Sequence, residues 1–202
     1  MRPRRTFSPK SLREFTTWIT AALAVATIFS TSVLTGGSTV AAATTGAPRC
    51  TTGELVVWLN TTGNGAAGSS YYNLEFTNLS AHSCSLSGFP GVSAISVAGQ
   101  QIGSAAGHNP EHPATLITLS SGSANAGFDG FQTGNTATVI LQITDAGNYP
   151  NSSCGRVAAA GLRVYPPNQT ASKVIPYPLV TCSHHGPLIL HVESVQKGVI
   201  SG

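Results

Sequence analysis

Apolar and polar side chains alternate along several stretches of the chain, and this alternation predicts β-strands. Over residues 72–77, Tyr72, Leu74 and Phe76 are apolar while the residues between them are polar. A period of two residues is typical of a half-buried strand with one apolar face and one wet face. The same alternation over residues 136–144 predicts the strongest strand of the second half. Further segments rich in β-forming residues predict strands at 54–59, 92–97, 100–102, 115–119, 162–165, 174–177 and 188–195.

Glycine, proline and short polar residues separate these segments and predict turns between them. Residues 61–70 are rich in glycine, serine and threonine, which predicts a connecting loop, and the Gly-Lys-Ser/Thr spacing of a phosphate-binding loop is missing there. Residues 147–154 predict a polar loop, and the alanines at 158–160 predict no more than one helical turn. Many short strands with frequent turns favour an all-β fold. We predict a single immunoglobulin-like β-sandwich.

The first 43 residues predict an export signal that is removed from the mature protein. Five basic side chains and an apolar stretch over 18–34 come before three alanines at 41–43, which are small enough for a cleaving peptidase. A membrane anchor is the alternative, but a spanning helix needs about 20 strongly apolar residues, and threonine and serine interrupt this stretch. Arg4 and Arg5 resemble a twin-arginine signal, so Sec and twin-arginine export both stay open. We expect residues 44–53 to be a flexible mature N-terminus and 54–202 to form the sandwich domain.

Removal of the leader changes the charge of the protein. The whole chain has a formal net charge of +3, but residues 44–202 hold five basic and six acidic side chains. A nearly neutral chain gives no electrostatic reason to bind nucleic acid or an anionic membrane. We therefore expect no nucleic-acid partner, no stable membrane insertion after cleavage, and a secreted or cell-envelope location.

Four cysteines lie beyond the leader, at Cys50, Cys84, Cys154 and Cys182. An even number of cysteines in an exported chain predicts two disulfides. Three pairings are possible. We favour Cys50–Cys84 with Cys154–Cys182, because each bond then joins neighbouring segments within one half of the chain. No Cys-x-x-Cys spacing occurs, which argues against a structural zinc site.

The segment around Cys84 carries the most specific motif, which ends in a Gly-Phe-Pro-Gly corner. The motif residues are Asn78, Cys84, Leu86, Gly88, Phe89, Pro90, Gly91 and Val92. Together with a later strand that ends in Pro166-Pro167 and the cysteines on either side of it, they resemble the signature of an actinobacterial secreted family called domain of unknown function 4232. The resemblance covers roughly residues 50–195. It implies a disulfide-bonded β-sandwich exported to the cell envelope or medium, and it brings no catalytic residues with it.

Histidine is the only residue type that suggests metal chemistry, with six in the chain. Neutral imidazole binds zinc and copper, so one hypothesis is an envelope metal-binding protein that uses His184, His185 and the loop histidines His108 and His112. Pro110 opposes a helix between the two loop histidines, so their rings need not share a face. The alternative is that all four are solvated loop residues. We expect no resident metal or cofactor.

The sequence offers no complete catalytic set. It has no Gly-x-Ser-x-Gly elbow, its cysteines are expected to be oxidised, and its acidic residues are dispersed, although they could still pair in space. We therefore expect no enzymatic activity and predict a binding or structural module with an unidentified extracellular or cell-wall partner. A hydrolase with an unrecognised site is a further alternative. Aromatic residues offer either core anchors or an exposed platform for sugar or peptide: Trp58, Tyr71, Phe128, Phe131 and Tyr149.

Overall fold

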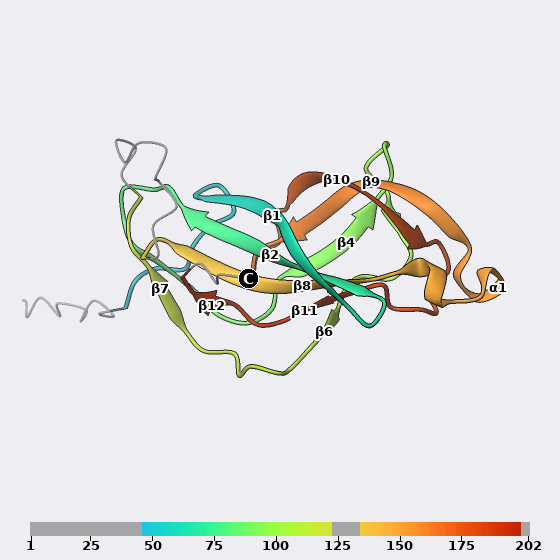
Figure 1. Cartoon of the computed structure of the whole chain (residues 1–202). Helices are drawn as coiled ribbons and strands as arrows, with labels where there is room; N and C mark the ends of the chain where they lie inside the picture. The colour runs from blue at the N-terminus through green and yellow to red at the C-terminus, as the bar shows by residue number, and fades with distance from the viewer. Residues whose placement is uncertain (1–45, 123–133, 199–202) are drawn as a thin grey trace, which may run out of the picture. The chain divides into compact units, whose positions relative to one another are not determined.

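Strands joined by turns make up most of the structure, a computed structural model that describes residues 46–122 and 134–198 (Figure 1). The predicted export signal and the aromatic pair Phe128 and Phe131 lie outside these residues. The described residues belong to one compact unit. Within the described residues, the structure contains no helix with the length and hydropathy of a membrane span.

Within the described part of the chain, the larger sheet contains six strands in the order β1-β2-β8-β11-β6, and β12 also pairs with β8. Their bounds are β1 (Leu55–Ala66), β2 (Ser69–Asn78), β6 (Gly107–His108), β8 (Thr136–Thr144), β11 (Leu190–Val192) and β12 (Gln196–Lys197). Its strands are antiparallel except for β6, which runs parallel to β11. Its three longest strands, β1, β2 and β8, are adjacent and make up most of this sheet.

The smaller main sheet has the order β10-β9-β4-β5 and forms the second layer. Its strands are β4 (Gly91–Ile95), β5 (Gln101–Ile102), β9 (Arg156–Tyr165) and β10 (Lys173–Cys182), and a separate pair is made by β3 (Cys84–Leu86) and β7 (Ile117–Leu119). Two short helical turns, η1 (Ala146–Asn148) and α1 (Asn151–Cys154), connect β8 to β9. The all-β sandwich predicted from the strand pattern is therefore confirmed, while its immunoglobulin-like character stays a prediction.

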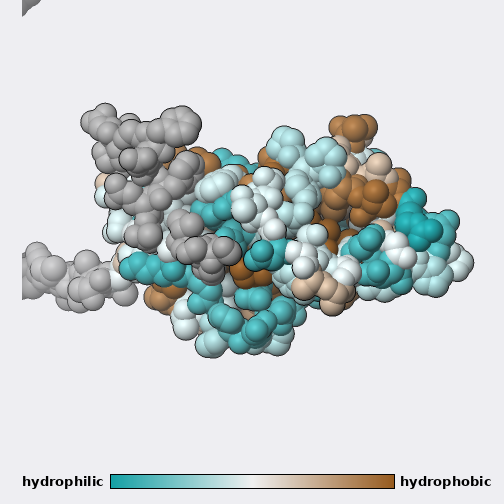
Figure 2. All heavy atoms as spheres, viewed as in Figure 1, coloured by the Kyte–Doolittle hydropathy of each residue, from teal (hydrophilic) through white to brown (hydrophobic). Residues whose placement is uncertain are grey.

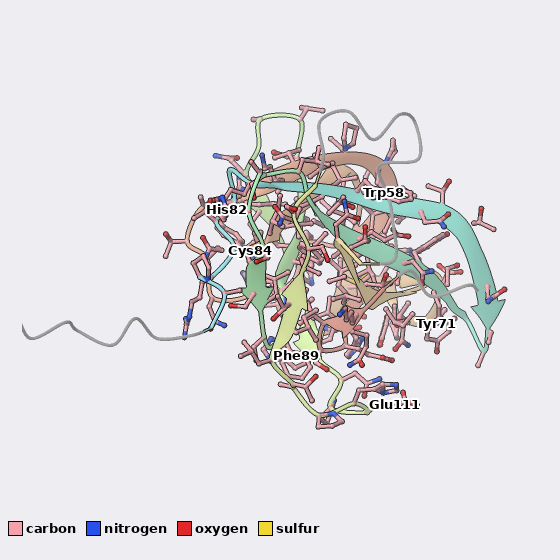
Figure 3. The ribbon with its side chains drawn as sticks, turned by 90° about the vertical axis from the view of Figure 1, so that its left-hand side faces the viewer. Trp58, Tyr71, His82, Cys84, Phe89 and Glu111 are labelled. Carbon is pink, nitrogen blue, oxygen red and sulfur yellow. A yellow bond between two sulfur atoms is a disulfide. The ribbon has the colours of Figure 1, made fainter. Side chains whose placement is uncertain are left out.

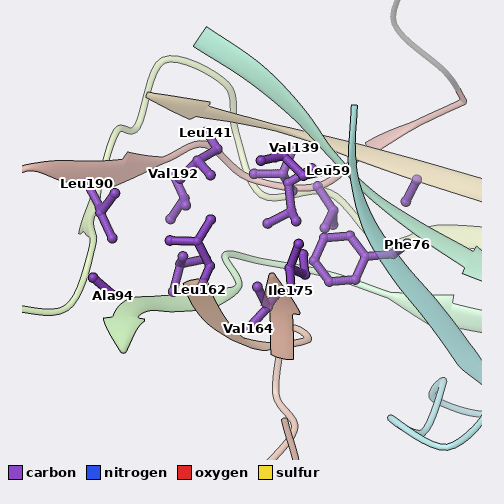
Figure 4. Close-up of a cluster of buried hydrophobic side chains, with 14 of the residues drawn as sticks. Leu59, Phe76, Ala94, Val139, Leu141, Leu162, Val164, Ile175, Leu190 and Val192 are labelled. Carbon is purple, nitrogen blue, oxygen red and sulfur yellow. The ribbon is translucent and has the colours of Figure 1, made fainter. Parts of the chain in front are cut away.

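The core lies between the two main sheets (Figure 4). Leu74 and Phe76 of β2 point inward from the larger sheet, and Leu162 and Val164 of β9 face them; all four are 0% exposed. Each fully buried side chain of this size stabilises the fold by roughly 1.5–3 kcal/mol relative to exposure. The alternation seen in the sequence therefore assigns the apolar face of β2 correctly.

The polar face of β2 is buried as well, so the predicted wet face is wrong. Asn73 is 7% exposed and Glu75 and Thr77 are 0% exposed. The reason is the position of the strand, because β2 lies between β1 and β8 and its side chains are flanked on both sides. Thr77 is satisfied by a hydrogen bond of 3.1 Å between its hydroxyl and that of Thr136.

Two further predictions are corrected by the strand pairing. Residues 61–70 form a hairpin instead of a loop: β1 continues to Ala66 through a register shift after Asn60 and then turns at Ala67-Gly68, where φ is 49° and 75°. Positive φ at both central residues is the geometry of a tight hairpin turn. The alanines at 158–160 belong to β9, because pairing with the neighbouring strand outweighs the high helix propensity of alanine.

The disulfides are Cys50–Cys84 and Cys154–Cys182, which confirms the favoured pairing. Neither bond joins the two main sheets, in contrast to the inter-sheet bond of antibody domains. The first bond fixes the start of the domain. Ser85 of β3 donates its backbone N–H to the Pro48 carbonyl at 2.7 Å, so part of the segment expected to be flexible is bonded to a strand.

Candidate functional site

A groove of about 470 Å³ opens between the larger sheet and β10. One wall is the tip of the β1–β2 hairpin, residues 65–70. The other walls come from Tyr72, residues 143–146 at the end of β8 and the start of η1, and residues Tyr177, Leu179 and Val180 of β10. The hairpin tip, η1 and the end of β10 lie together on the right-hand side of Figure 1. The groove is therefore built from segments that are far apart in the sequence.

Two tyrosine rings contribute the aromatic surface of the groove. The Tyr72 and Tyr177 rings meet edge to face with centroids 5.5 Å apart. Burial and a hydrogen bond with Tyr72 raise the pKa of Tyr177 to about 12, so its hydroxyl stays neutral at physiological pH. Tyr72 also packs on the backbone of Gly63, where an added Cβ would lie 2.5 Å from its ring. Because residue 63 is glycine, β1 can pass close to the Tyr72 ring, and this contact restricts the ring's position.

Hydrogen bonds fix the rim of the groove. The Gly68 carbonyl at the hairpin tip accepts from the backbone N–H of Asp145 at 2.8 Å and from the side chain of Asn148 at 2.9 Å. The Ser69 hydroxyl lies 3.2 Å from that of Thr144. These contacts join the hairpin to the end of β8, so the opening is formed before any ligand arrives.

Apolar side chains continue along the surface beside the groove. Val180, which lines the groove, is 55% exposed, and Val174 on the same strand is 57% exposed. Figure 2 shows hydrophobic residues gathered at the upper right, in the region where Figure 1 places β9, β10 and the turn after β4. Exposed apolar surface next to a preformed opening is typical of a binding surface.

Acidic residues and histidines gather elsewhere, on the outer face of the larger sheet. Tyr71, Glu111, His191 and Glu193 help to line a small hollow of about 100 Å³, and Figure 3 shows Tyr71 and Glu111 on this side of the molecule. Burial raises the pKa of Glu193, and the charge of Glu111 raises it further, whereas His112 opposes the shift. Nδ1 of His112 lies 3.9 Å from the Glu193 carboxylate. The hollow is smaller than the roughly 300–1,000 Å³ of typical ligand pockets.

Glu75 is a further buried acid on the outer face of this sheet. It pairs in register with Trp58 of β1 and Thr138 of β8. Neither of its carboxyl oxygens has a hydrogen-bond partner among the residues that the structure describes. Burial raises the pKa of Glu75 to about 7. This burial was not predictable from the alternation over residues 72–77, because an acid on the polar face of an alternating strand is expected to be solvated.

The histidines proposed as metal ligands do not form a site. His108 stacks on Phe89 with ring centroids 4.4 Å apart, His112 lies beside Glu193, and His184 and His185 are exposed after β10. Over residues 46–122 and 134–198, no group of three or more His, Cys, Asp or Glu side chains could hold a metal ion. The geometry therefore gives the metal-binding alternative no support in this part of the chain.

Comparison with known families identifies the domain. Residues 50–195 match the family described as Domain of unknown function (DUF4232). The chain belongs to this family. No curated protein and no solved structure matches it. The two-sheet fold and its groove therefore belong to a DUF4232 domain.

The motif residues of this DUF4232 domain build a corner next to the disulfide. The Asn78 side chain donates to the carbonyls of His82 at 2.8 Å and Ser120 at 2.9 Å. Gly88 has a φ of 99°, which favours glycine, and its carbonyl accepts from Val195 at 3.0 Å. The corner Gly88-Phe89-Pro90-Gly91 then leads into β4. These residues have structural roles, and none of them lines the groove.

The aromatic residues considered as a binding platform are dispersed. Trp58, Tyr71 and Tyr149 are half-buried, and none of them lines the groove. The groove instead uses Tyr72 and Tyr177, which the sequence places on a core face and in an edge strand. Their only sequence signal was aromatic character in a predicted strand, which equally predicts burial in the core.

Proposed function

We propose that this DUF4232 protein is a non-catalytic binding module that acts in the medium or the cell envelope and binds its ligand in the groove. The observation that carries this proposal is the groove itself. Its volume of about 470 Å³ lies within the roughly 300–1,000 Å³ of small-ligand sites, and its rim is already fixed by hydrogen bonds. A preformed rim reduces the entropy lost on binding.

The chemistry of the groove supports binding without turnover. Nucleophilic catalysis needs a nucleophile, a base within hydrogen-bond reach and a group that orients the base. Among the residues that the structure describes, no histidine or cysteine lines the groove, and the one carboxylate, Asp145, accepts a hydrogen bond from the backbone of Gly147 at 2.8 Å. The Ser69 hydroxyl is occupied by Gln142 and Thr144.

The two disulfides support a location outside the cytoplasm. All four cysteines are paired, and structural disulfides persist in oxidising compartments. The nearly neutral charge of residues 44–202 favours an uncharged or weakly charged partner over nucleic acid or an anionic membrane. We propose an extracellular or cell-wall component as the partner.

A blocking substitution tests the proposed function. Ala66 is exposed and lines the groove, so Ala66→Trp fills the opening from the hairpin, while Asn64→Trp adds the same bulk two residues away and outside the lining. The disulfide-bonded chain is titrated with soluble oligosaccharides, peptides and lipids from a bacterial envelope and followed by NMR chemical shifts. We expect at least one probe to bind the native chain and Asn64→Trp but not Ala66→Trp. The proposal would be refuted if Ala66→Trp bound a probe as tightly as the native chain does, or if no class of probe bound at all.

A further inference from the structure

The groove is nearly free of charge, and this property restricts its ligand. Of the fourteen described residues that line the groove, only Asp145 is charged, and it is exposed; none of the fourteen is a lysine, arginine or histidine. Phosphate and carboxylate ligands are recognised by cations or clusters of N–H donors. An anionic ligand would meet a like charge here and no counter-charge, so nucleotides, phospholipid headgroups and acidic polymers do not fit.

The strands beside the groove are poorly suited to pair with a peptide. Peptide recognition by strand addition requires a regular, open sheet edge. Pro176 and Pro178 interrupt β10, which also shifts register between Pro176 and Leu179, and β1 shifts register between Asn60 and Asn64. Prolines and bulges are devices that prevent edge pairing. An extended peptide would therefore find no continuous ladder to join.

A purely apolar ligand fits no better. The groove carries the hydroxyls of Ser70 and Thr144, the Asp145 carboxylate and the peptide groups of the hairpin tip. Covering polar groups without giving them partners costs about 1–3 kcal/mol each. The ligand must therefore present hydrogen-bonding groups toward the rim and apolar surface toward the rings of Tyr72 and Tyr177.

We infer that the groove binds a short uncharged saccharide, an inference that rests on the proposed function of this same site. Sugar hydroxyls donate to the Asp145 carboxylate and exchange hydrogen bonds with Ser70 and Thr144. The C–H faces of the sugar rings pack on Tyr72 and Tyr177, whose amphipathic rings combine apolar area with a polar tip. The fixed hairpin tip supplies further peptide groups at no ordering cost.

The test titrates the purified, disulfide-bonded chain with defined probes. These are neutral trisaccharides of N-acetylglucosamine, mannose, galactose and arabinose, the acidic trisaccharide of galacturonic acid, and a neutral tetrapeptide, each measured by calorimetry and NMR shifts. We expect at least one neutral trisaccharide to bind, and the acidic trisaccharide to bind at least about tenfold more weakly than the best neutral one. Tyr177→Ala is expected to weaken binding of the neutral trisaccharide by about tenfold or more. Asp145→Asn, which keeps the shape of the rim, is expected to weaken it by several fold.

Controls separate the inference from the proposed function. Asn64→Trp is expected to bind the neutral trisaccharide as the native chain does. Ala66→Trp is expected to abolish binding, and because Ala66 is exposed, this substitution is not expected to destabilise the fold. If only the acidic trisaccharide or the tetrapeptide binds and Ala66→Trp blocks it, the saccharide inference is wrong and the binding groove stands. If no probe binds, or if binding is indifferent to Ala66→Trp, both are wrong.

Discussion

The buried carboxyl of Glu75 makes the stability of this protein depend on pH in an unusual direction. The side chain is 0% exposed, and no residue in the described part of the chain gives it a hydrogen bond. Burial raises its pKa from 4.5 to about 7. We expect Glu75→Gln, which keeps the size of the side chain and removes its charge, to abolish this dependence.

The direction of this pH dependence follows from the protonation of Glu75 in the folded and the unfolded protein. Between about pH 4.5 and pH 7, unfolding releases the Glu75 proton, because the unfolded carboxyl ionises and the folded one does not. Stability therefore falls as the pH rises through this window, by up to about 1.4 kcal/mol per pH unit. The full shift corresponds to at most about 3 kcal/mol. At pH 8 the glutamine variant is thus expected to be more stable by up to that amount, which raises the melting temperature by about 6–12 °C.

The assay is urea unfolding of both disulfide-bonded proteins from pH 4 to pH 8 at constant ionic strength. At pH 4 both side chains are neutral, and we expect nearly equal free energies of unfolding. The difference is expected to grow up to about pH 7 and then level off. Glu193, whose pKa burial also raises, is present in both proteins and cancels from the difference. A difference that stays constant with pH would show that Glu75 titrates normally and is not buried in this way.

Two further substitutions test the fold. Cys154→Ser with Cys182→Ser removes a cross-link between residues 28 apart, and we expect a loss of about 3.5 kcal/mol in the free energy of unfolding; an unchanged urea midpoint would contradict the structural role of the bond. Gly161→Ala places a Cβ 2.3 Å from the Ile175 carbonyl oxygen and is expected to cost about 2–4 kcal/mol by thermal unfolding. Gly65→Ala, whose nearest atom would lie 3.9 Å away, is the control, and equal losses would refute the close packing of β9 on β10.

Local patterns predicted the strands that carry a strong period of their own. The alternation over residues 136–144 coincides with β8, and residues 72–77 lie within β2. The cysteine pairing was also accessible, because each bond joins segments that are close in the sequence. In these cases the information lies within a short window of chain.

Features that depend on distant partners could not be predicted in the same way. Residues 61–66 are a strand because they belong to the hairpin with β2. Their threonines and glycines would suit a loop equally well. The burial of Glu75 depends on its flanking strands. Residues 107–108 of β6 pair in parallel with residues 191–192 of β11. No local sequence pattern predicts this long-range contact.

The candidate site was the least predictable part of the molecule. Tyr72 lies on the apolar face of an alternating predicted strand and Tyr177 in a predicted edge strand, and neither pattern distinguishes an aromatic core residue from one that lines a groove. Glu111 and Glu193 looked dispersed in the sequence, but the pairing of β6 with β11 brings their segments together. Convergence of this kind is a property of the topology, and the sequence alone does not reveal it.

The two disulfides also determine how the protein can mature. Each joins cysteines that are consecutive along the chain, 34 and 28 residues apart, so neither loop encloses a cysteine of the other pair. If the chain is exported unfolded and amino end first, Cys84 is the first available partner of Cys50, and the bond can close by thiol exchange before Cys154 is present. Pairing each cysteine with the next one along the chain therefore yields the native connectivity.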